Sequence, residues 1–146
     1  MNIEVNKKNL ELLAREYGVK FVVLYGSHVA GKTIEESDVD VAVFFETRRV
    51  PESFSRYSEI MQKLAEALQV EIGKLDFVIL NKANILLRYE ITAKGKLLFG
   101  DEDEYLQYKA FAFRDYHDAK SLFQLEDLLI RKRQTLLKQS LSGISA

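Results

Sequence analysis

The stretch LYGSHVAGKTIEESDVDVAV, residues 24–43, decides the fold of this chain. It joins two apolar segments, residues 20–25 and 38–45, that are rich in β-branched and aromatic side chains. Such segments favour buried strands. Between them, the pair Gly26-Ser27 predicts a turn, followed by a short helical piece. The stretch therefore predicts two strands joined by a connection that begins with glycine and serine.

Two aspartates stand one residue apart at the entry to the second strand. Because a strand has a period of two residues, the side chains of Asp38 and Asp40 project from the same face. Asp76 interrupts another apolar segment, residues 74–80, although aspartate is depleted in strands. If the two strands are neighbours, the three carboxylates converge on one site. The alternative is that Asp38 and Asp40 are solvated loop residues and that Asp76 hydrogen-bonds a loop.

Converging carboxylates would need a positive charge beside them. Two carboxylates ~4 Å apart repel by roughly 4 kcal/mol at an effective dielectric constant near 20. The chain has two histidines and no cysteine, so no cluster of these residues competes for a metal. Ligands that are all oxygen atoms favour Mg²⁺ or Mn²⁺, and Mg²⁺ commonly takes one or two carboxylates plus substrate phosphate oxygens. The three aspartates are therefore candidate metal ligands.

The turn at Gly26-Ser27 has the features of a phosphate-binding site. Glycine lets the backbone approach an anion, and the first N–H groups of a following helix can donate to it together with the serine hydroxyl. An ordinary turn is the alternative. Residues 26–33, GSHVAGKT, also match the P-loop pattern of NTPases. Only four residues separate Thr33 from Asp38, too few for the long helix of a P-loop crossover, so the sequence disfavours a P-loop NTPase.

The rest of the chain alternates helical and strand patterns. We predict a helix at residues 9–17, a helix that begins at Pro51, a helix from Asn81 to about residue 89, a strand at residues 95–100 and a helical tail from residue 101 to about 138. The second helix is predicted to bury one apolar stripe, formed by Phe54, Tyr57, Met61, Leu64 and Leu68. This order of elements predicts an α/β (α+β) fold in which helices flank a small sheet.

The tail carries more apolar surface than one helix face can bury. One stripe consists of Tyr105, Tyr108, Ala112, Tyr116, Ala119 and Phe123, and four further apolar residues lie outside it: Leu106, Phe113, Leu122 and Leu129. One stripe can pack on the domain, and a second favours a partner or another copy of the chain. The alternative is a break in the helix that folds both stripes inward. We therefore divide the chain into a core, residues 1–100, and a helical extension, residues 101–146, that packs on the core or serves as an interface.

Composition narrows the class of protein. A chain of 146 residues with 47% hydrophobic residues predicts one domain with one modest core. The absence of cysteine excludes disulfides, zinc–cysteine clusters and thiol nucleophiles. The net charge of −1 argues against extended nucleic-acid binding. No apolar stretch is long enough to span a bilayer or to form a signal peptide, so we expect a cytoplasmic protein without membrane contact.

Gly26-Ser27, ten intervening residues and Asp38-Val39-Asp40 form the pattern G-S-x10-D-x-D. Together with Asp76, this pattern resembles the signature of the DNA polymerase beta-like nucleotidyltransferase superfamily. The surrounding stretches, LYGS at residues 24–27 and SDVDVAV at residues 37–43, are similar to the sequences of the minimal nucleotidyltransferases (MNT proteins) of that superfamily. The resemblance covers about residues 22–80 and extends to residue 100 at most. Many relatives follow Gly-Ser with an arginine and a further basic residue; His28 and Ala30 stand in those places, so fewer phosphate contacts are expected.

The resemblance implies a nucleotidyltransferase fold with a mixed sheet and a metal site. Asp38, Asp40 and Asp76 would be the catalytic residues and would bind two Mg²⁺ ions, for which Mn²⁺ can substitute. Gly26 and Ser27 would hold the β- and γ-phosphates of a nucleoside triphosphate, with ATP as the expected substrate.

The resemblance also implies a partner. Stand-alone MNT proteins resemble antitoxins that adenylylate a tyrosine of a HEPN-domain toxin. The implied function is Mg²⁺-dependent transfer of AMP from ATP to such a toxin, encoded nearby, in a toxin–antitoxin pair. A non-catalytic, nucleotide-binding antitoxin is the alternative, and the intact set of aspartates favours the enzyme. The acceptor, the nucleobase, the number of nucleotides transferred and the oligomeric state stay open; the C-terminal helix allows self-association.

Overall fold

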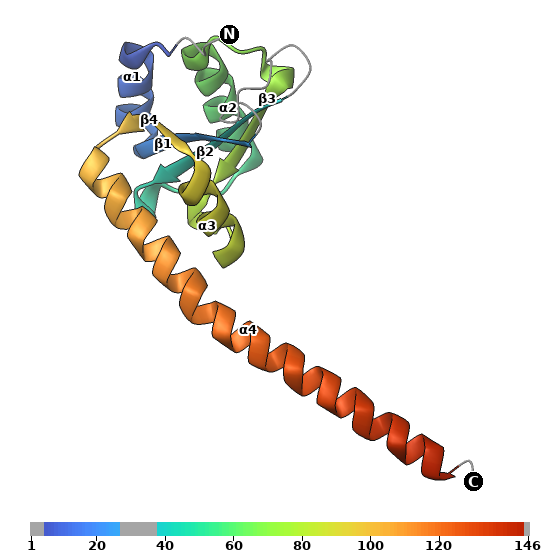
Figure 1. The fold of residues 1–146 in the computed structure, drawn as a ribbon. Coiled ribbons are helices and arrows are strands. Elements are labelled where there is room, and N and C mark those ends of the chain that lie inside the picture. The colour runs from blue at the N-terminus through green and yellow to red at the C-terminus, as the bar shows by residue number, and fades with distance from the viewer. Residues whose placement is uncertain (1–4, 27–37, 145–146) are drawn as a thin grey trace.

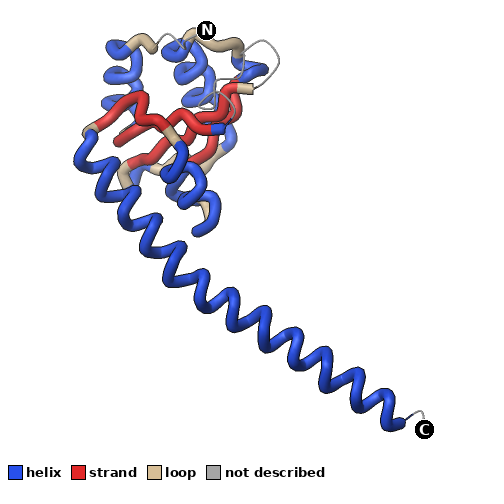
Figure 2. The backbone as a smooth tube through the Cα atoms, in the orientation of Figure 1, coloured by secondary structure: helices blue, strands red, loops and turns tan. Residues whose placement is uncertain are grey.

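The computed structural model describes residues 5–26 and 38–144 (Figure 1). Its helices and strands are α1 (Lys7–Tyr17), β1 (Val19–Tyr25), β2 (Val39–Phe45), α2 (Phe54–Leu68), β3 (Leu75–Ile79), α3 (Ile85–Lys94), β4 (Lys96–Gly100) and α4 (Glu102–Ile144). The strands form one sheet in the order β3-β2-β1-β4. β1 is antiparallel to β2 and β4, whereas β2 and β3 are parallel. The predicted mixed sheet flanked by helices is confirmed (Figure 2).

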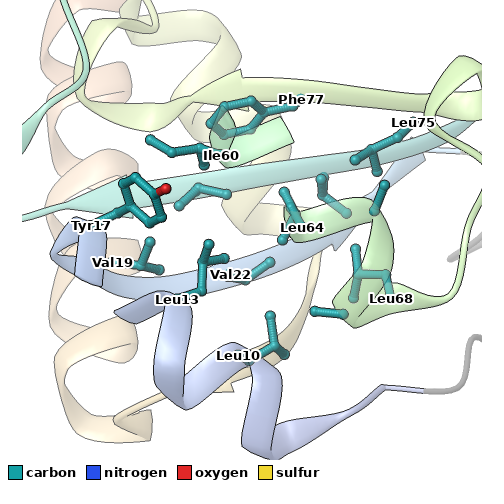
Figure 3. Close-up of a cluster of buried hydrophobic side chains, with 14 of the residues drawn as sticks. Leu10, Leu13, Tyr17, Val19, Val22, Ile60, Leu64, Leu68, Leu75 and Phe77 are labelled. Carbon is teal, nitrogen blue, oxygen red and sulfur yellow. The ribbon is translucent and has the colours of Figure 1, made fainter. Parts of the chain in front are cut away.

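One face of the sheet is covered by α1 and α2. Alternate side chains of the central strands, among them Val22, Val41 and Val43, belong to one buried cluster with Leu10 of α1 and Leu64 of α2. All five are less than 1% exposed. Figure 3 shows Val22, Leu10 and Leu64 in this cluster. Burying a leucine or valine side chain contributes about 1.5–3 kcal/mol, so this layer contributes strongly to the stability of the fold.

The opposite face is covered by α3 and by the beginning of α4. Phe21 of β1 is fully buried there and meets the Tyr105 ring edge-on, with 5.4 Å between centroids and 70° between ring planes. It also stacks on Phe44 at 4.9 Å. Tyr105 is 5% exposed and Ala112 is 1% exposed, so the first turns of α4 are part of the hydrophobic core. The division of the chain at residue 100 into two units stays a prediction.

The predicted start of the second helix at Pro51 is wrong. α2 begins at Phe54, because the Ser53 side chain accepts a hydrogen bond from the Arg56 backbone N–H and caps the helix. Pro51 is buried in the preceding loop, where its carbonyl accepts from Lys82 Nζ. Phe54, predicted to belong to the buried stripe, is 85% exposed.

Asn81 does not cap a helix, contrary to the sequence prediction. Its side chain bonds the backbone of Phe45 twice, accepting from the N–H and donating to the carbonyl, each at 3.0 Å. The side-chain amide of Asn81 therefore pairs with Phe45, the last residue of β2, much as the backbone of a neighbouring strand would. Asn84, three residues later, caps α3 by accepting from Leu87 N.

The tail is one uninterrupted helix of 43 residues, and the predicted alternative of a break is wrong. α4 packs on α3 through a parallel stack of Tyr89 and Tyr116, with 4.2 Å between ring centroids. Beyond residue 120 every side chain is exposed as far as residue 143, and Figure 1 shows the helix leaving the domain. Among the residues with described positions, no helix is both long and apolar enough to cross a membrane.

Candidate active site

Asp40 and Asp76 lie side by side in the sheet. They are partners in the parallel pair of β2 and β3, and paired residues of neighbouring strands project from the same face. Val39 and Val41 are buried under α1 and α2, so Asp40 projects from the other face. Asp40 is half-buried and Asp76 is exposed. The structure therefore brings together two of the three predicted carboxylates.

Gly26 lies directly against the Asp40 side chain. It follows β1 with a φ of 80°, a left-handed conformation that favours glycine. A Cβ atom added at this position would overlap a carboxylate oxygen of Asp40. Asp38 is exposed and precedes β2 by one residue. Ser27 lies outside the described residues, so its predicted phosphate contact stays a prediction. The predicted metal contact of Asp38 also stays a prediction.

Tyr25 is the last residue of β1 and lies beside Asp40. The sequence did not predict it as a residue of the site. It is the antiparallel partner of Asp40 and immediately precedes Gly26. Burial, followed by the charges of Asp40 and Asp76, raises the pKa of Tyr25 from 10.0 to about 12. A signal was present in the sequence, since a residue just before the glycine of a strand–turn site must lie at the strand end. Its pairing with Asp40 depends on the strand register, which the sequence alone did not give.

Tyr57 of α2 anchors β3 next to Asp76. Its hydroxyl donates a 2.7 Å hydrogen bond to the carbonyl of Phe77, and the two rings stack with centroids 4.8 Å apart. Burial, and then the charge of Asp76, raises the pKa of Tyr57. The sequence placed Tyr57 in the buried stripe of its helix. The structure adds that its polar end fixes the strand that carries Asp76.

The donor set fits a hard divalent cation. Asp40 and Asp76 offer carboxylate oxygens from adjacent strands, and their negative charges help to raise the pKa of Tyr25. Mg²⁺ is commonly bound by one or two carboxylates together with substrate phosphates. Within residues 5–26 and 38–144, no group of three or more His, Cys, Asp or Glu side chains lies close enough to hold a metal ion. The described part of the site therefore offers two carboxylates, those of Asp40 and Asp76, to a divalent cation.

The antiparallel pairing of β1 and β2 argues against a P-loop at residues 26–33. A P-loop lies between a strand and the helix of a parallel crossover. Here Val23 of β1 pairs directly with Ala42 of β2, and the two strands run in opposite directions. The connection between them is therefore not a βαβ crossover.

Tyr25 should make the stability of the protein fall at high pH. The unfolded chain loses this phenolic proton near pH 10, whereas the folded chain keeps it to about pH 12. The stabilisation is fully present below pH 10 and is lost as the pH rises to about 12. We expect the free energy of unfolding of Tyr25→Phe to fall less than that of the parent across this range, as measured by urea unfolding at several pH values. Equal losses in both proteins would contradict this assignment.

The chain is similar to known proteins over much of its length. The family model described as polymerase beta, nucleotidyltransferase, matches residues 7–104. A Methanocaldococcus jannaschii protein, provisionally named a protein adenylyltransferase, is 36% identical over 69 residues, which cover 47% of this chain and 68% of that protein. The protein adenylyltransferase MntA of Shewanella oneidensis is 27% identical over 113 residues, 76% of this chain and 77% of that protein.

A solved structure shows the same fold. A chain in the structure of a tri-AMPylated Shewanella oneidensis HEPN toxin in complex with its MNT antitoxin superposes with a TM-score of 0.59 at 23% identity. The superposition covers 85% of this chain and 96% of that chain. At this identity the similarity concerns the fold. The family match spans most of the chain, from α1 to the first turn of α4, and includes every strand of the described sheet. The chain therefore belongs to the polymerase beta nucleotidyltransferase family.

Proposed function

We propose that this nucleotidyltransferase transfers AMP from ATP to a tyrosine hydroxyl of a HEPN-domain toxin and thereby acts as the antitoxin of a toxin–antitoxin pair. The observation that carries the catalytic part of the proposal is the in-register pairing of Asp40 with Asp76 beside Gly26. The names of the relatives support protein adenylylation, and the solved complex of an AMPylated HEPN toxin with an MNT antitoxin supports the partner.

Asp38, Asp40 and Asp76 would hold two Mg²⁺ ions, and Gly26 and Ser27 would bind the β- and γ-phosphates. When bound, the divalent cations would neutralise charge on the attacking and leaving oxygens. Because glycine has no Cβ, the backbone at position 26 lies directly against the Asp40 carboxylate, so a phosphate bound by Gly26 would lie close to a cation held by Asp40.

The transfer reaction balances with the groups of the proposed site. The phenolic oxygen of the acceptor attacks the α-phosphorus of ATP, and the bond between the α-phosphorus and its bridging oxygen breaks. Pyrophosphate leaves with that oxygen, and a phosphodiester forms between AMP and tyrosine. The Asp76 carboxylate, which is exposed at the edge of the site, accepts the proton of the acceptor hydroxyl.

The proposal is tested by incubating the protein with the HEPN-domain protein encoded beside it and with ATP labelled on the α-phosphate. We expect label on the partner, its retention after denaturation, and a mass increase of one or more AMP units at tyrosine. Excess chelator should abolish labelling. ATP should raise the unfolding temperature much more with Mg²⁺ than without it, since the carboxylates repel bare triphosphate.

Three outcomes separate this proposal from its rivals. Partner neutralisation without label would indicate a non-catalytic, nucleotide-binding antitoxin. Transfer in excess chelator would remove the metal from the mechanism. Release of the γ-phosphate without nucleotide transfer would point to an NTPase.

A further inference from the structure

The distal part of α4, residues 120–143, has no packing partner within the described chain. Every side chain of this segment is exposed. Nine large apolar side chains are among them: Leu122, Phe123, Leu125, Leu128, Leu129, Ile130, Leu136, Leu137 and Leu141. A helix with so much exposed apolar surface marks an interaction site.

Two opposite charges interrupt the apolar side of this segment. Leu122, Glu126, Leu129, Arg133 and Leu136 follow one another at spacings of four and three residues, which places them on one face. Glu126 and Arg133 are therefore surrounded by leucines. Neither takes part in an ion pair of the described structure, whereas the neighbouring Asp127 and Arg131 pair with each other at 3.2 Å.

We propose that the distal part of α4 binds a second copy of this chain in an antiparallel arrangement, in which Glu126 of each copy pairs with Arg133 of the other. A two-fold axis midway between the two residues, beside Leu129 and Ile130, produces both ion pairs at once. The same symmetry sets Leu122 and Phe123 opposite Leu136 and Leu137 of the other copy. A parallel pair would instead bring Glu126 against Glu126.

The charge pattern is the reason for choosing a second copy as the occupant. A carboxylate and a guanidinium two helical turns apart are self-complementary only when the helix meets its own reversed image. Polar groups on an otherwise apolar helix face fix the register and orientation of a helix pair. The proposal does not depend on the proposed catalytic function. Figure 1 shows the distal helix extending away from the sheet that carries the candidate site.

The test measures the mass of the full chain in solution by light scattering and sedimentation. We expect a dimer at micromolar concentrations for the parent. Glu126→Arg alone places two arginines of one copy against two of the other, and Arg133→Glu alone does the same with glutamates. Each variant should weaken the dimer at least about tenfold. Lys138→Glu reverses a charge on the opposite side of the helix and should leave the dimer intact.

Two rescue experiments identify the antiparallel pairing. The double variant E126R/R133E restores both ion pairs and should dimerise like the parent. An equimolar mixture of the two single variants should form heterodimers, because each then meets its opposite charges. Thermal unfolding and helix content are measured for every variant to check that it is folded. We expect all of them to fold, because the substituted side chains are exposed. A monomeric parent, no effect of the single reversals, or no rescue in either experiment would overturn the proposal. A monomer whose distal helix is protected only by the HEPN-domain protein would assign the surface to that partner instead.

Discussion

Replacing Asp40 with asparagine should abolish nucleotide transfer, with a loss of about a thousandfold or more. Asp40 is half-buried between the Tyr25 strand end, Gly26 and Asp76, so its charge acts in a partly dehydrated place. Asparagine keeps the shape but removes the charge that would hold a cation and its triphosphate. We expect both ATP binding and transfer to fail, as measured by calorimetric titration with Mg·ATP and by the labelled-AMP assay. Asp38→Asn should behave in the same way if Asp38 shares this role.

Lys32→Ala is the control for the loss of activity in Asp40→Asn. Lys32 is the lysine of the overlapping P-loop pattern and lies outside the described residues. A nucleotidyltransferase should keep much of its activity in this variant, whereas a P-loop enzyme should lose it. The reverse ranking, with Lys32 essential and Asp40 dispensable, would revive the P-loop interpretation.

Asp76→Asn should separate binding from chemistry. The Asp76 side chain is exposed, and we propose that it serves the acceptor hydroxyl and the second ion, which matter mainly in the transition state. An interaction made only in the transition state lowers turnover and leaves ground-state binding nearly unchanged. We expect near-parental affinity for Mg·ATP together with a loss of transfer of about a hundredfold or more.

Titration and transfer are measured on one preparation of Asp76→Asn. Tyr57→Phe is a matched structural control, since it removes the hydrogen bond to Phe77 that anchors the same strand but keeps the ring stack. It should lower activity less than Asp76→Asn does. Normal transfer by Asp76→Asn would show that Asp76 is a structural residue of the strand.

The strands were predictable because their mostly apolar runs are short and have glycine or charged residues near their ends. The predicted segments 20–25 and 74–80 differ from β1 and β3 by one residue at most at each end. The alternation of Asp38 and Asp40 and the apolar neighbours of Asp76 were also enough to nominate the site. The sheet order then placed Asp40 and Asp76 next to each other, which the sequence could only assume.

The errors arose where two local choices had similar strength. Asn81 and Asn84 are both good helix caps, and the choice between them is made by the contact of Asn81 with Phe45, a residue far away in the chain. Pro51 suits a first helical turn, but Ser53 offers the side-chain oxygen that caps it. The roles of Tyr25 and of the Tyr57 hydroxyl were not predicted for a similar reason, since they depend on strand register and helix docking.

The parallel pairing of β2 and β3 has a consequence for when the site forms during folding. Parallel neighbours cannot be joined by a hairpin, and here the whole of α2 lies between them. Asp40 and Asp76 therefore meet only after the chain has closed a long loop and α2 has docked, a contact that is slow to form. By contrast, β1 and β2 pair antiparallel and neighbour each other in the chain. A growing chain would thus bring Gly26 beside Asp40 early, whereas Asp76 would join them only once β3 has been synthesised and paired.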